Sequence, residues 1–358
     1  MNTAIILATA CLTLIGGLGG ILAAKLGVPL PYMMGSMVTV AVAATLFRQH
    51  FPADYKFPQS FRLIFIAAIG VMIGAQVTAD LIGMIPSMAL SFAAITLFVP
   101  LAHGGNYLIF RHLGRYSPPT AFYCGTPGGL MESLAMGEEA GADIATLTMQ
   151  QFLRIVLVIS IVPIGLSLWV GAPVGSSGGQ SLSHMAAFDF HTLPFVLLTA
   201  LAGLGIGKLI RLPAWQLTGP LFAAAVISAT GLMELDLPVW MISLCQVVLG
   251  VSLGTRFGGL TPSKLARGMG LGVISVGYML GLGAGFVLLL RLVLDMRFDV
   301  LLISFAPGGV TEMALVALSL AANPAFVTAH HIWRIILTVI EIALLSKFRP
   351  FPPANNPD

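Results

Sequence analysis

Long apolar runs, separated by short polar segments, set the pattern of this chain. Six runs are nearly free of charged side chains: 3–24, 83–103, 149–170, 192–207, 268–290 and 325–346. A helix of about 20 apolar residues spans the hydrocarbon core of a bilayer, which is about 30 Å thick. The pattern therefore predicts an all-α, polytopic membrane protein. We expect the first run to be a retained span rather than a cleaved signal, because no basic residue precedes it.

Composition agrees with this interpretation. Of 358 residues, 57% are hydrophobic and 9% are charged, whereas soluble domains carry about 25% charged residues. We expect five spans in each half of the chain, with a Pro-Gly-Gly element between the fourth and the fifth. The spans are 3–24, 30–47, 61–79, 83–110 and 142–170 in the first half, and 192–210, 214–232, 238–256, 266–291 and 324–346 in the second.

The two halves are an internal repeat. The stretch TPGGLMES at 126–133 returns as APGGVTEM at 306–313. A shift of 180 places Pro127, Gly128, Gly129, Glu132 and Arg154 on Pro307, Gly308, Gly309, Glu312 and Arg334, and a shift of 184 places Gly19, Pro29 and Gly35 on Gly203, Pro213 and Gly219. We therefore divide the chain into membrane repeat 1 (1–170), a Gly/Ser-rich linker (171–187), membrane repeat 2 (188–346) and a cytoplasmic tail (347–358).

The basic residues indicate that the two repeats are inserted in opposite directions. Cytoplasmic loops are enriched in lysine and arginine. These residues follow the second and fourth spans of repeat 1 (Arg48, Lys56, Arg62; Arg111, Arg115) but the first, third and fifth spans of repeat 2 (Lys208, Arg211; Arg256, Lys264, Arg267; Lys347, Arg349). Arg291 and Arg297 depart from this parity. Opposite parity requires an odd number of crossings in each repeat, and it places both termini in the cytoplasm.

Each Pro-Gly-Gly triplet predicts an interrupted or re-entrant helix. Proline lacks a backbone donor and glycine tolerates unusual dihedral angles. A broken helix leaves free N–H groups at the positive start of its second part, where an anion is stabilised. Because non-helical backbone inside a membrane is tolerated only against protein or water, the two interruptions predict a polar cavity.

Two interpretations apply to Glu132 and Glu312, which follow the second glycine of each triplet by three residues. Each carboxylate can cap the start of its own helix. Alternatively, each handles a coupling proton or sodium ion, since carboxylates within membranes are costly and usually functional.

A polar stripe surrounds an arginine on the last span of each repeat. Gln150 and Gln151 precede Arg154, and His330 and His331 precede Arg334, which Glu341 follows by seven residues. Residues three, four and seven apart share one face of a helix. The arginines either hold an anionic solute, with Gln151 and His331 beside them, or neutralise the glutamate of their own repeat.

The remaining chemistry is sparse. Cys11, Cys124 and Cys245 are scattered and predict free thiols, and no histidine or cysteine spacing predicts a metal site or another cofactor. The net charge is +3, with basic residues placed singly at the ends of apolar runs, so we expect no nucleic-acid partner. No catalytic constellation is visible, and we expect no enzyme activity.

The duplicated [TA]-P-G-G-x-x-E motif with its downstream arginine resembles the AbrB duplication family of bacterial inner-membrane proteins. The resemblance extends from about residue 10 to 346 and implies a bacterial inner-membrane location. Some members of that family are labelled ammonia monooxygenases and others regulators of gene expression, and the resemblance transfers no catalytic residue. Because these residues include no clustered imidazoles for a redox metal, they do not support the monooxygenase label.

Interrupted helices in inverted repeats are typical of secondary transporters. We therefore predict a transporter for a small anionic or zwitterionic solute, coupled to protons or sodium, with the bilayer as its surroundings and a homo-oligomer left open. The predicted site comprises Pro127, Gly128, Gly129, Glu132, Gln151, Arg154, Pro307, Gly308, Gly309, Glu312, His331 and Arg334. The alternatives are a membrane sensor that affects gene expression and, in third place, a membrane monooxygenase.

Overall fold

The computed structural model describes residues 3–47, 49, 51–52, 55–77, 85–173, 192–233, 235, 237–259, 262–320 and 322–348. These residues form helices and connections, with no strand among them. Most of the predicted linker (174–187) and most of the predicted tail (349–358) lie outside the described residues, as does Arg48.

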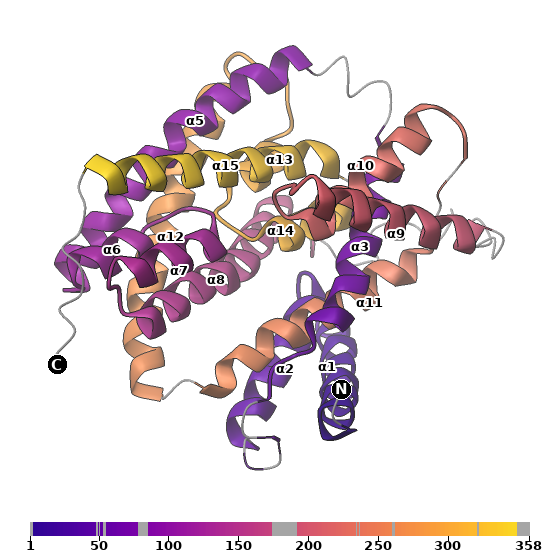
Figure 1. Ribbon diagram of the computed structural model, residues 1–358, viewed down its shortest axis with the longest axis horizontal. Coiled ribbons are helices and arrows are strands. Elements are labelled where there is room, and N and C mark those ends of the chain that lie inside the picture. Colours follow the sequence, from indigo (N-terminus) through magenta and orange to yellow (C-terminus); the bar gives the residue numbers. More distant parts are fainter. Residues whose placement is uncertain are drawn as a thin grey trace. The chain divides into compact units, whose positions relative to one another are not determined.

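Each of the ten predicted spans contains a helix (Figure 1). In the first half these are α1 (Thr3–Lys25), α2 (Pro31–Leu46), α3 (Gln59–Ala75), α5 (Ile85–Leu108), which a short π-helix η2 (Ile109–Leu113) extends, and α8 (Ile144–Val170). In the second half they are α9 (Leu193–Leu209), α10 (Trp215–Ala229), α11 (Val239–Gly254), which a 3₁₀ turn η5 (Thr255–Gly259) extends, α12 (Pro262–Leu290) and α15 (Pro324–Phe348).

Within the described residues, six helices are long and apolar enough to cross a bilayer: α1, α5 with η2, α8, α11 with η5, α12 and α15. The other four predicted spans, α2, α3, α9 and α10, have 15 to 17 residues, or about 25 Å at 1.5 Å per residue. All four end earlier than predicted, α2 and α9 by one residue each and α3 and α10 by more, at Ala75 and Ala229. Proline sets the start of several helices, as at Pro31, the first residue of α2, and Pro58, the N-cap of α3, because its fixed φ suits the first turn.

Both Pro-Gly-Gly triplets lie in non-helical links between short helices, as the sequence pattern predicts. The first link joins α6 (Pro118–Cys124) to α7 (Leu130–Glu139), and the second joins α13 (Phe298–Phe305) to α14 (Val310–Ser319). Gly129, the N-cap of α7, has a φ of 59°, a left-handed conformation that favours glycine. The chain therefore turns at 125–129 and 306–309 instead of continuing as one rod.

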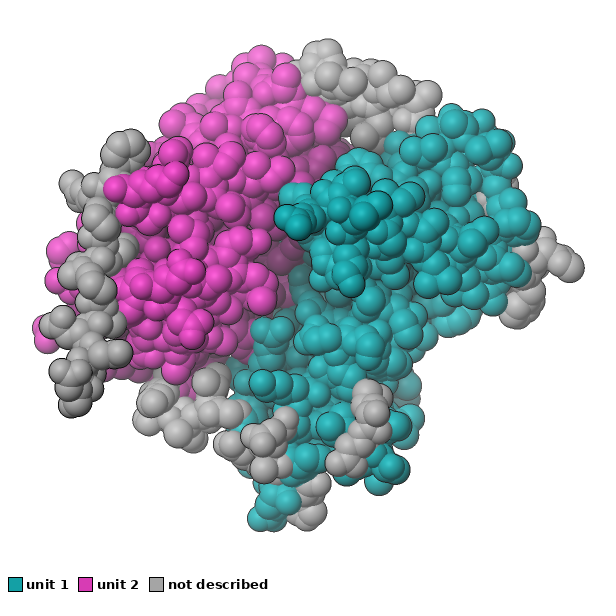
Figure 2. Space-filling model, viewed as in Figure 1, with its two compact units in different colours: residues 1–82, 160–260, 311–325 teal, residues 83–159, 261–310, 326–358 magenta. Residues whose placement is uncertain are grey.

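The chain divides into two compact units, and each unit contains segments from both halves of the sequence (Figure 2). Unit 1 comprises residues 1–82, 160–260 and 311–325, and it includes α1–α3, α9–α11 and nearly all of α14. Unit 2 comprises residues 83–159, 261–310 and 326–358. It includes α5–α7, most of α8, α12 and α13, and most of α15.

Inside unit 1 the two halves exchange partners, since α3 packs on α10 and α11 packs on α2. A Cβ atom on Gly74 would lie 2.2 Å from the carbonyl oxygen of Leu221, and one on Gly254 would lie 2.6 Å from that of Met37. Only glycine allows backbones this close, as in other helix pairs packed through small residues. The glycines are 180 residues apart and their partners 184 apart, so both packing contacts follow the register of the sequence repeat.

A matched pair of substitutions on α9 tests this packing. A Cβ on Gly203 would lie 2.5 Å from Cα of Pro220, whereas a Cβ on Gly205 meets nothing within 4 Å. We expect Gly203→Ala to lower the free energy of unfolding by about 1–3 kcal/mol through overpacking. We expect Gly205→Ala to be neutral or stabilising by up to about 1 kcal/mol, because alanine favours helix. Thermal unfolding of both variants in detergent measures the difference, and equal midpoints would contradict the packing.

An aromatic cluster forms part of the interior of unit 2. Phe98 of α5 meets Phe305 of α13 edge-on, with ring centroids 5.7 Å apart, and Phe286 of α12 stacks on Phe305 at 6.0 Å. Phe98 and Phe305 are both almost fully buried. Contacts of this kind add about 0.5–1.5 kcal/mol beyond area burial. The cluster fixes the short helix α13, at whose end the second interruption begins.

Candidate functional site

The first interruption is held by two polar side chains of α8. The guanidinium of Arg154 donates from Nη1 to the carbonyl oxygen of Thr126. Gln151 Nε2 donates to the carbonyl oxygen of Tyr123 and to Oγ1 of Thr126, each at 2.8 Å. Carbonyl groups at the end of a helix have no partner within the helix. Arg154 and Gln151 therefore supply the donors that the chain loses where α6 stops.

The second interruption is held in the same way by α15. Arg334 donates from Nη1 to the carbonyl oxygen of Ala306 and from Nη2 to that of Gly308, at 2.7 Å. His331 Nε2 lies 2.9 Å from the carbonyl oxygen of Ile303, and its Nδ1 lies 3.0 Å from Nη2 of Arg334. A carbonyl only accepts, so Nε2 carries the proton and Nδ1 accepts from the arginine. His331 is thus a neutral ring that orients Arg334.

These two arrangements match position by position across 180 residues. In each, the arginine donates to a carbonyl just past a short helix, and the residue three places before it donates to the carbonyl three places earlier. Gly128 also adjoins the second arrangement, since a Cβ there would lie 3.2 Å from Oγ1 of Thr338 on α15. The predicted residues Gln151, Arg154, His331 and Arg334 are therefore brought together with the interruptions in unit 2.

The interpretation in which each arginine neutralises the glutamate of its own repeat gains no support: within unit 2 Arg154 does not meet Glu132, and within unit 1 Glu312 pairs with Arg62. Arg154 and Arg334 are 5% and 1% exposed, and neither has a carboxylate within salt-bridge distance among the described residues of unit 2. Carbonyl groups at the negative ends of α6 and α13 take that role instead. Each arginine also has a buried Nε without a hydrogen-bond partner among the described residues, and the charge of Arg154 acts electrostatically on Arg334. Two buried like charges so arranged attract an anion.

Glu312 has a different partner from the one that the repeat suggests. Within unit 1 its Oε1 lies 3.2 Å from Nη2 of Arg62, and Glu312 is 4% exposed. Arg256 of η5 also acts electrostatically on both groups. The sequence analysis placed Arg62 in a basic loop, but it lies in the first turn of α3. A basic residue one turn into an apolar helix is the signal that could have identified it.

Glu132, the equivalent of Glu312 in the first repeat, is exposed on the first turn of α7. Its Oε2 lies 3.5 Å from the position that a Cβ on Gly129 would occupy. Among the described residues it makes no hydrogen bond or ion pair. The two glutamates therefore differ in surroundings although they share a motif, and only Glu132 presents a free carboxylate.

The other polar residues of the two stripes point elsewhere. Gln150 Nε2 donates to the hydroxyl of Tyr116 at 2.9 Å. His330 Nδ1 lies 2.8 Å from the carbonyl oxygen of Phe326, and its Nε2 lies 2.7 Å from Oγ of Ser91. Since the carbonyl must accept, Nδ1 carries a proton, and the serine hydroxyl that Nε2 meets also donates to the carbonyl oxygen of Met88. These side chains tie helices together and do not join the arginines.

Comparison with known proteins finds one family model and two relatives that match most of this chain. The family model described as "Transition state regulatory protein AbrB" matches residues 32–349. A Bacillus subtilis protein named "Uncharacterized protein YhjN" is 24% identical over 355 residues, covering 93% of this chain and 90% of its own. An Escherichia coli protein named "Putative regulator AbrB" is 23% identical over 296 residues, covering 82% of this chain and 84% of its own. The match to the family spans both interruptions and both arginines.

Proposed function

This chain belongs to the AbrB family, and we propose that it is a secondary transporter that moves a small anionic or zwitterionic solute, coupled to protons or sodium. One observation carries the proposal. Unit 2 buries two guanidinium groups, and their hydrogen bonds go to backbone carbonyls and to one neutral histidine. A carboxylate or phosphate on the solute would supply the negative charge that the described residues of unit 2 do not place beside them.

The architecture of the proposed transporter is a pair of inverted repeats of about five spans, each with a re-entrant or broken helix. Three observations support it: the parity of the basic loops, the paired glycine contacts of unit 1 and the paired arginine contacts of unit 2. Inverted repeats with discontinuous helices recur in secondary transporters, where the substrate binds at the breaks. The six long apolar helices support a multi-pass location, which we assign to the bacterial inner membrane with both termini in the cytoplasm.

Binding of the solute would use the backbone as well as the arginines. Gly129 caps α7 without a side-chain hydrogen bond, so the first N–H groups of that helix have no side-chain acceptor. An anion between those N–H groups and the guanidinium groups gains from the positive helix end and from charge-assisted hydrogen bonds. Pro127 and Gly128, with Pro307, Gly308 and Gly309 in the second repeat, shape this site by keeping the chain out of helix. Glu132 presents a carboxylate for a coupling cation.

We propose transport rather than catalysis, with the solute, a coupling cation and the bilayer as partners and with no nucleic-acid partner. A second candidate function is sensing, in which the chain affects gene expression through another protein. The name of the Escherichia coli relative favours this alternative. A sensor would still bind a solute at the arginines but would move none across a membrane.

Flux measurements distinguish the two functions. Purified full-length protein is reconstituted into liposomes and assayed with labelled mono- and dicarboxylates, amino acids and phosphate, under an inward proton gradient and then an inward sodium gradient. We expect at least one solute to accumulate tenfold or more above protein-free liposomes. If the protein binds a solute but moves none of the panel under either gradient, transport is wrong and sensing is favoured.

A further inference from the structure

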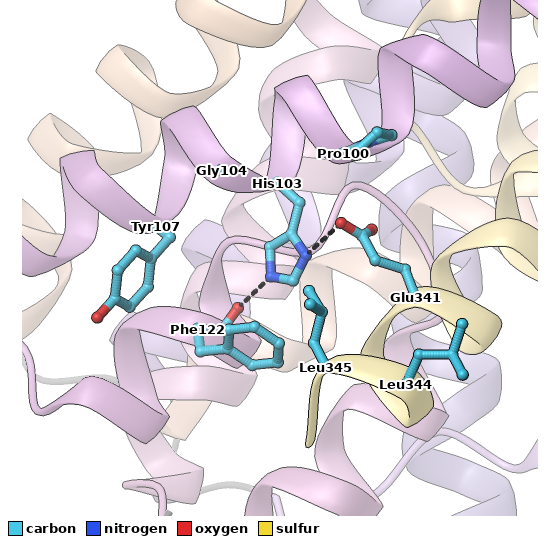
Figure 3. A pocket seen from close by; sticks show the side chains of 8 residues that line it. All are labelled: Pro100, His103, Gly104, Tyr107, Phe122, Glu341, Leu344 and Leu345. Carbon is cyan, nitrogen blue, oxygen red and sulfur yellow. Dashed lines mark hydrogen bonds and ion pairs between the residues drawn. The ribbon is translucent and has the colours of Figure 1, made fainter. Parts of the chain in front are cut away.

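Unit 2 contains a pocket of about 540 Å³ that the two arginines do not line (Figure 3). Three helices form it: α5 with His103 and Tyr107, α6 with Phe122, and α15 with Glu341 and Leu344. Its volume is within the range of small-molecule pockets, which is about 300–1,000 Å³. Most of the lining is apolar, and the side chains of His103 and Glu341 meet at its wall (Figure 3).

The hydrogen bonds of His103 determine where its protons are. Nε2 lies 2.9 Å from the carbonyl oxygen of Phe122, and Nδ1 lies 3.2 Å from Oε1 of Glu341. The carbonyl only accepts, so Nε2 must carry a proton. In a neutral ring Nδ1 would then be an acceptor facing a carboxylate oxygen, and two acceptors repel. The contact therefore requires one further proton between Nδ1 and Oε1, carried by either the imidazolium or the carboxylic acid.

With this proton the pair has no net charge, and without it the pair is an anion in apolar surroundings. His103 is 2% exposed, and Oε2 of Glu341 is buried and accepts no hydrogen bond from the described residues. Loss of the proton would thus leave a buried carboxylate without a donor, which is costly. We expect the pair to separate when the proton leaves, so that proton binding is linked to the packing of α15 against α5.

No other titratable side chain on these three helices compensates the charge of the Glu341 carboxylate in place of the shared proton. They are Tyr107 on α5, Tyr123 and Cys124 on α6, and His330, His331, Arg334 and Lys347 on α15. Of these, Tyr107 lines the pocket, and Lys347 is exposed. Arg334 lies on α15 seven residues before Glu341, but it donates to Ala306 and Gly308. Among the described residues, His103 alone lies within salt-bridge distance of the Glu341 carboxylate.

The pair has no counterpart in the repeat. A shift of 180 places His103 on Gly283 and Glu341 on Ile161, neither of which titrates. The arginine contacts occur twice, whereas this pair occurs once and joins a helix of the first half to a helix of the second. A single proton-binding pair in a duplicated framework is consistent with one proton moved in each cycle.

We propose that His103 and Glu341 are the proton-coupling site of this protein, with the pocket as the place where the proton exchanges. This inference rests on the proposed transport function; it names the proton as the coupling ion and assigns it to His103 and Glu341 instead of to Glu132. The solute site at the arginines and the proton site are then separate groups of residues in unit 2, connected by α15, which carries both Arg334 and Glu341.

Glu341→Gln tests the inference, because a glutamine N–H can donate to Nδ1 of neutral His103 and so imitate the protonated pair without titrating. Thermal unfolding of the purified full chain is measured from pH 6 to 9. Loss of the shared proton would leave the Glu341 carboxylate buried without a donor, so we expect the stability of the folded protein to fall as the pH rises. We expect the midpoint of the wild type to fall over this range and that of Glu341→Gln to fall by less than half as much. His103→Gln should show the same loss of pH dependence, and Glu138→Gln, an exposed carboxylate in unit 2, should behave as wild type.

Transport gives the second measurement. In liposomes, we expect Glu341→Gln to lower proton-driven accumulation at least tenfold and to leave solute counterflow, which needs no proton gradient, within about twofold of wild type. An unchanged pH dependence of unfolding in Glu341→Gln overturns the proton site. Proton-driven accumulation that survives in this variant overturns the coupling role alone. If the wild type performs neither accumulation nor counterflow, the proposed function is wrong, and the coupling role fails with it even where the unfolding data show a bound proton.

Discussion

Replacing Arg334 by glutamine is expected to weaken binding of an anionic solute roughly 10- to 150-fold, because a hydrogen bond to a charged group contributes about 1.5–3 kcal/mol. Arg334 is 1% exposed and sits between two carbonyl groups and a neutral histidine, so its charge is poorly screened. Its equivalent Arg154 should show a loss of the same order. A thermal-shift screen of the purified protein against organic acids and amino acids measures both, since a ligand stabilises the state that it binds.

Folding must be separated from binding in this test. Removing Arg334 leaves the carbonyl oxygens of Ala306 and Gly308 without their donor, which destabilises the second interruption. The unliganded unfolding midpoint therefore has to be measured first, and Arg334→Lys provides a variant that keeps the charge but lacks the planar fork. Arg297→Gln is the control, because Arg297 also belongs to unit 2 but is 60% exposed and pairs with Asp299.

We expect Arg297→Gln to bind as wild type, Arg334→Lys to bind weakly and Arg334→Gln to bind weakest. Stabilisation by a solute that stays the same in folded Arg334→Gln and Arg154→Gln would remove both arginines from the binding site. The transport proposal would then lose the observation on which it rests.

Glu312→Gln is expected to destabilise the protein by about 3 kcal/mol, because it leaves the charge of Arg62 without its carboxylate in a largely buried setting. Glu312 is 4% exposed, and both Arg62 and Arg256 act on it. Thermal unfolding in detergent measures the loss. In the double variant Arg62→Gln with Glu312→Gln, part of the stability should return, with a coupling energy of about 0.5–3 kcal/mol.

Glu132→Gln is the matched control, since the repeat places Glu132 at the same position of the motif but on an exposed turn without a partner among the described residues. We expect its unfolding midpoint to stay close to that of wild type. Equal effects of the two substitutions would show that the Arg62–Glu312 ion pair contributes nothing specific to stability.

The sequence predicted the framework of this fold well, for physical reasons that particular residues illustrate. Each apolar run that predicted a span contains a helix, and proline followed by two glycines marked both interruptions. These signals are local in the sequence. The repeat register identified Arg154 and Arg334 and the residues three places before them. Helix lengths were less certain: α3 ends at Ala75 and not at 79, since apolar composition does not mark where a helix stops.

The contact partners of the charged side chains could not be predicted from the sequence. Arginine and glutamate in one motif favour an ion pair on composition alone, but the arginines meet carbonyl groups whose availability depends on where α6 and α13 end. Glu312 meets Arg62, 250 residues earlier. His103 appears isolated in the sequence and meets Glu341 only because α5 and α15 are neighbours in unit 2. Contacts between residues so far apart in the sequence produce no local pattern of residue types from which they could be predicted.

The exchange of partners in unit 1 has a consequence for dissection of the gene. α3 packs on α10, and α11 packs on α2. If the gene is cut between residues 174 and 191, each of the two fragments therefore lacks the helices against which its own glycines pack. Neither fragment should accumulate when produced alone. Produced together, the two pieces should complement each other as a split protein, and a lone first piece would need a second molecule in the opposite orientation to fill the same role.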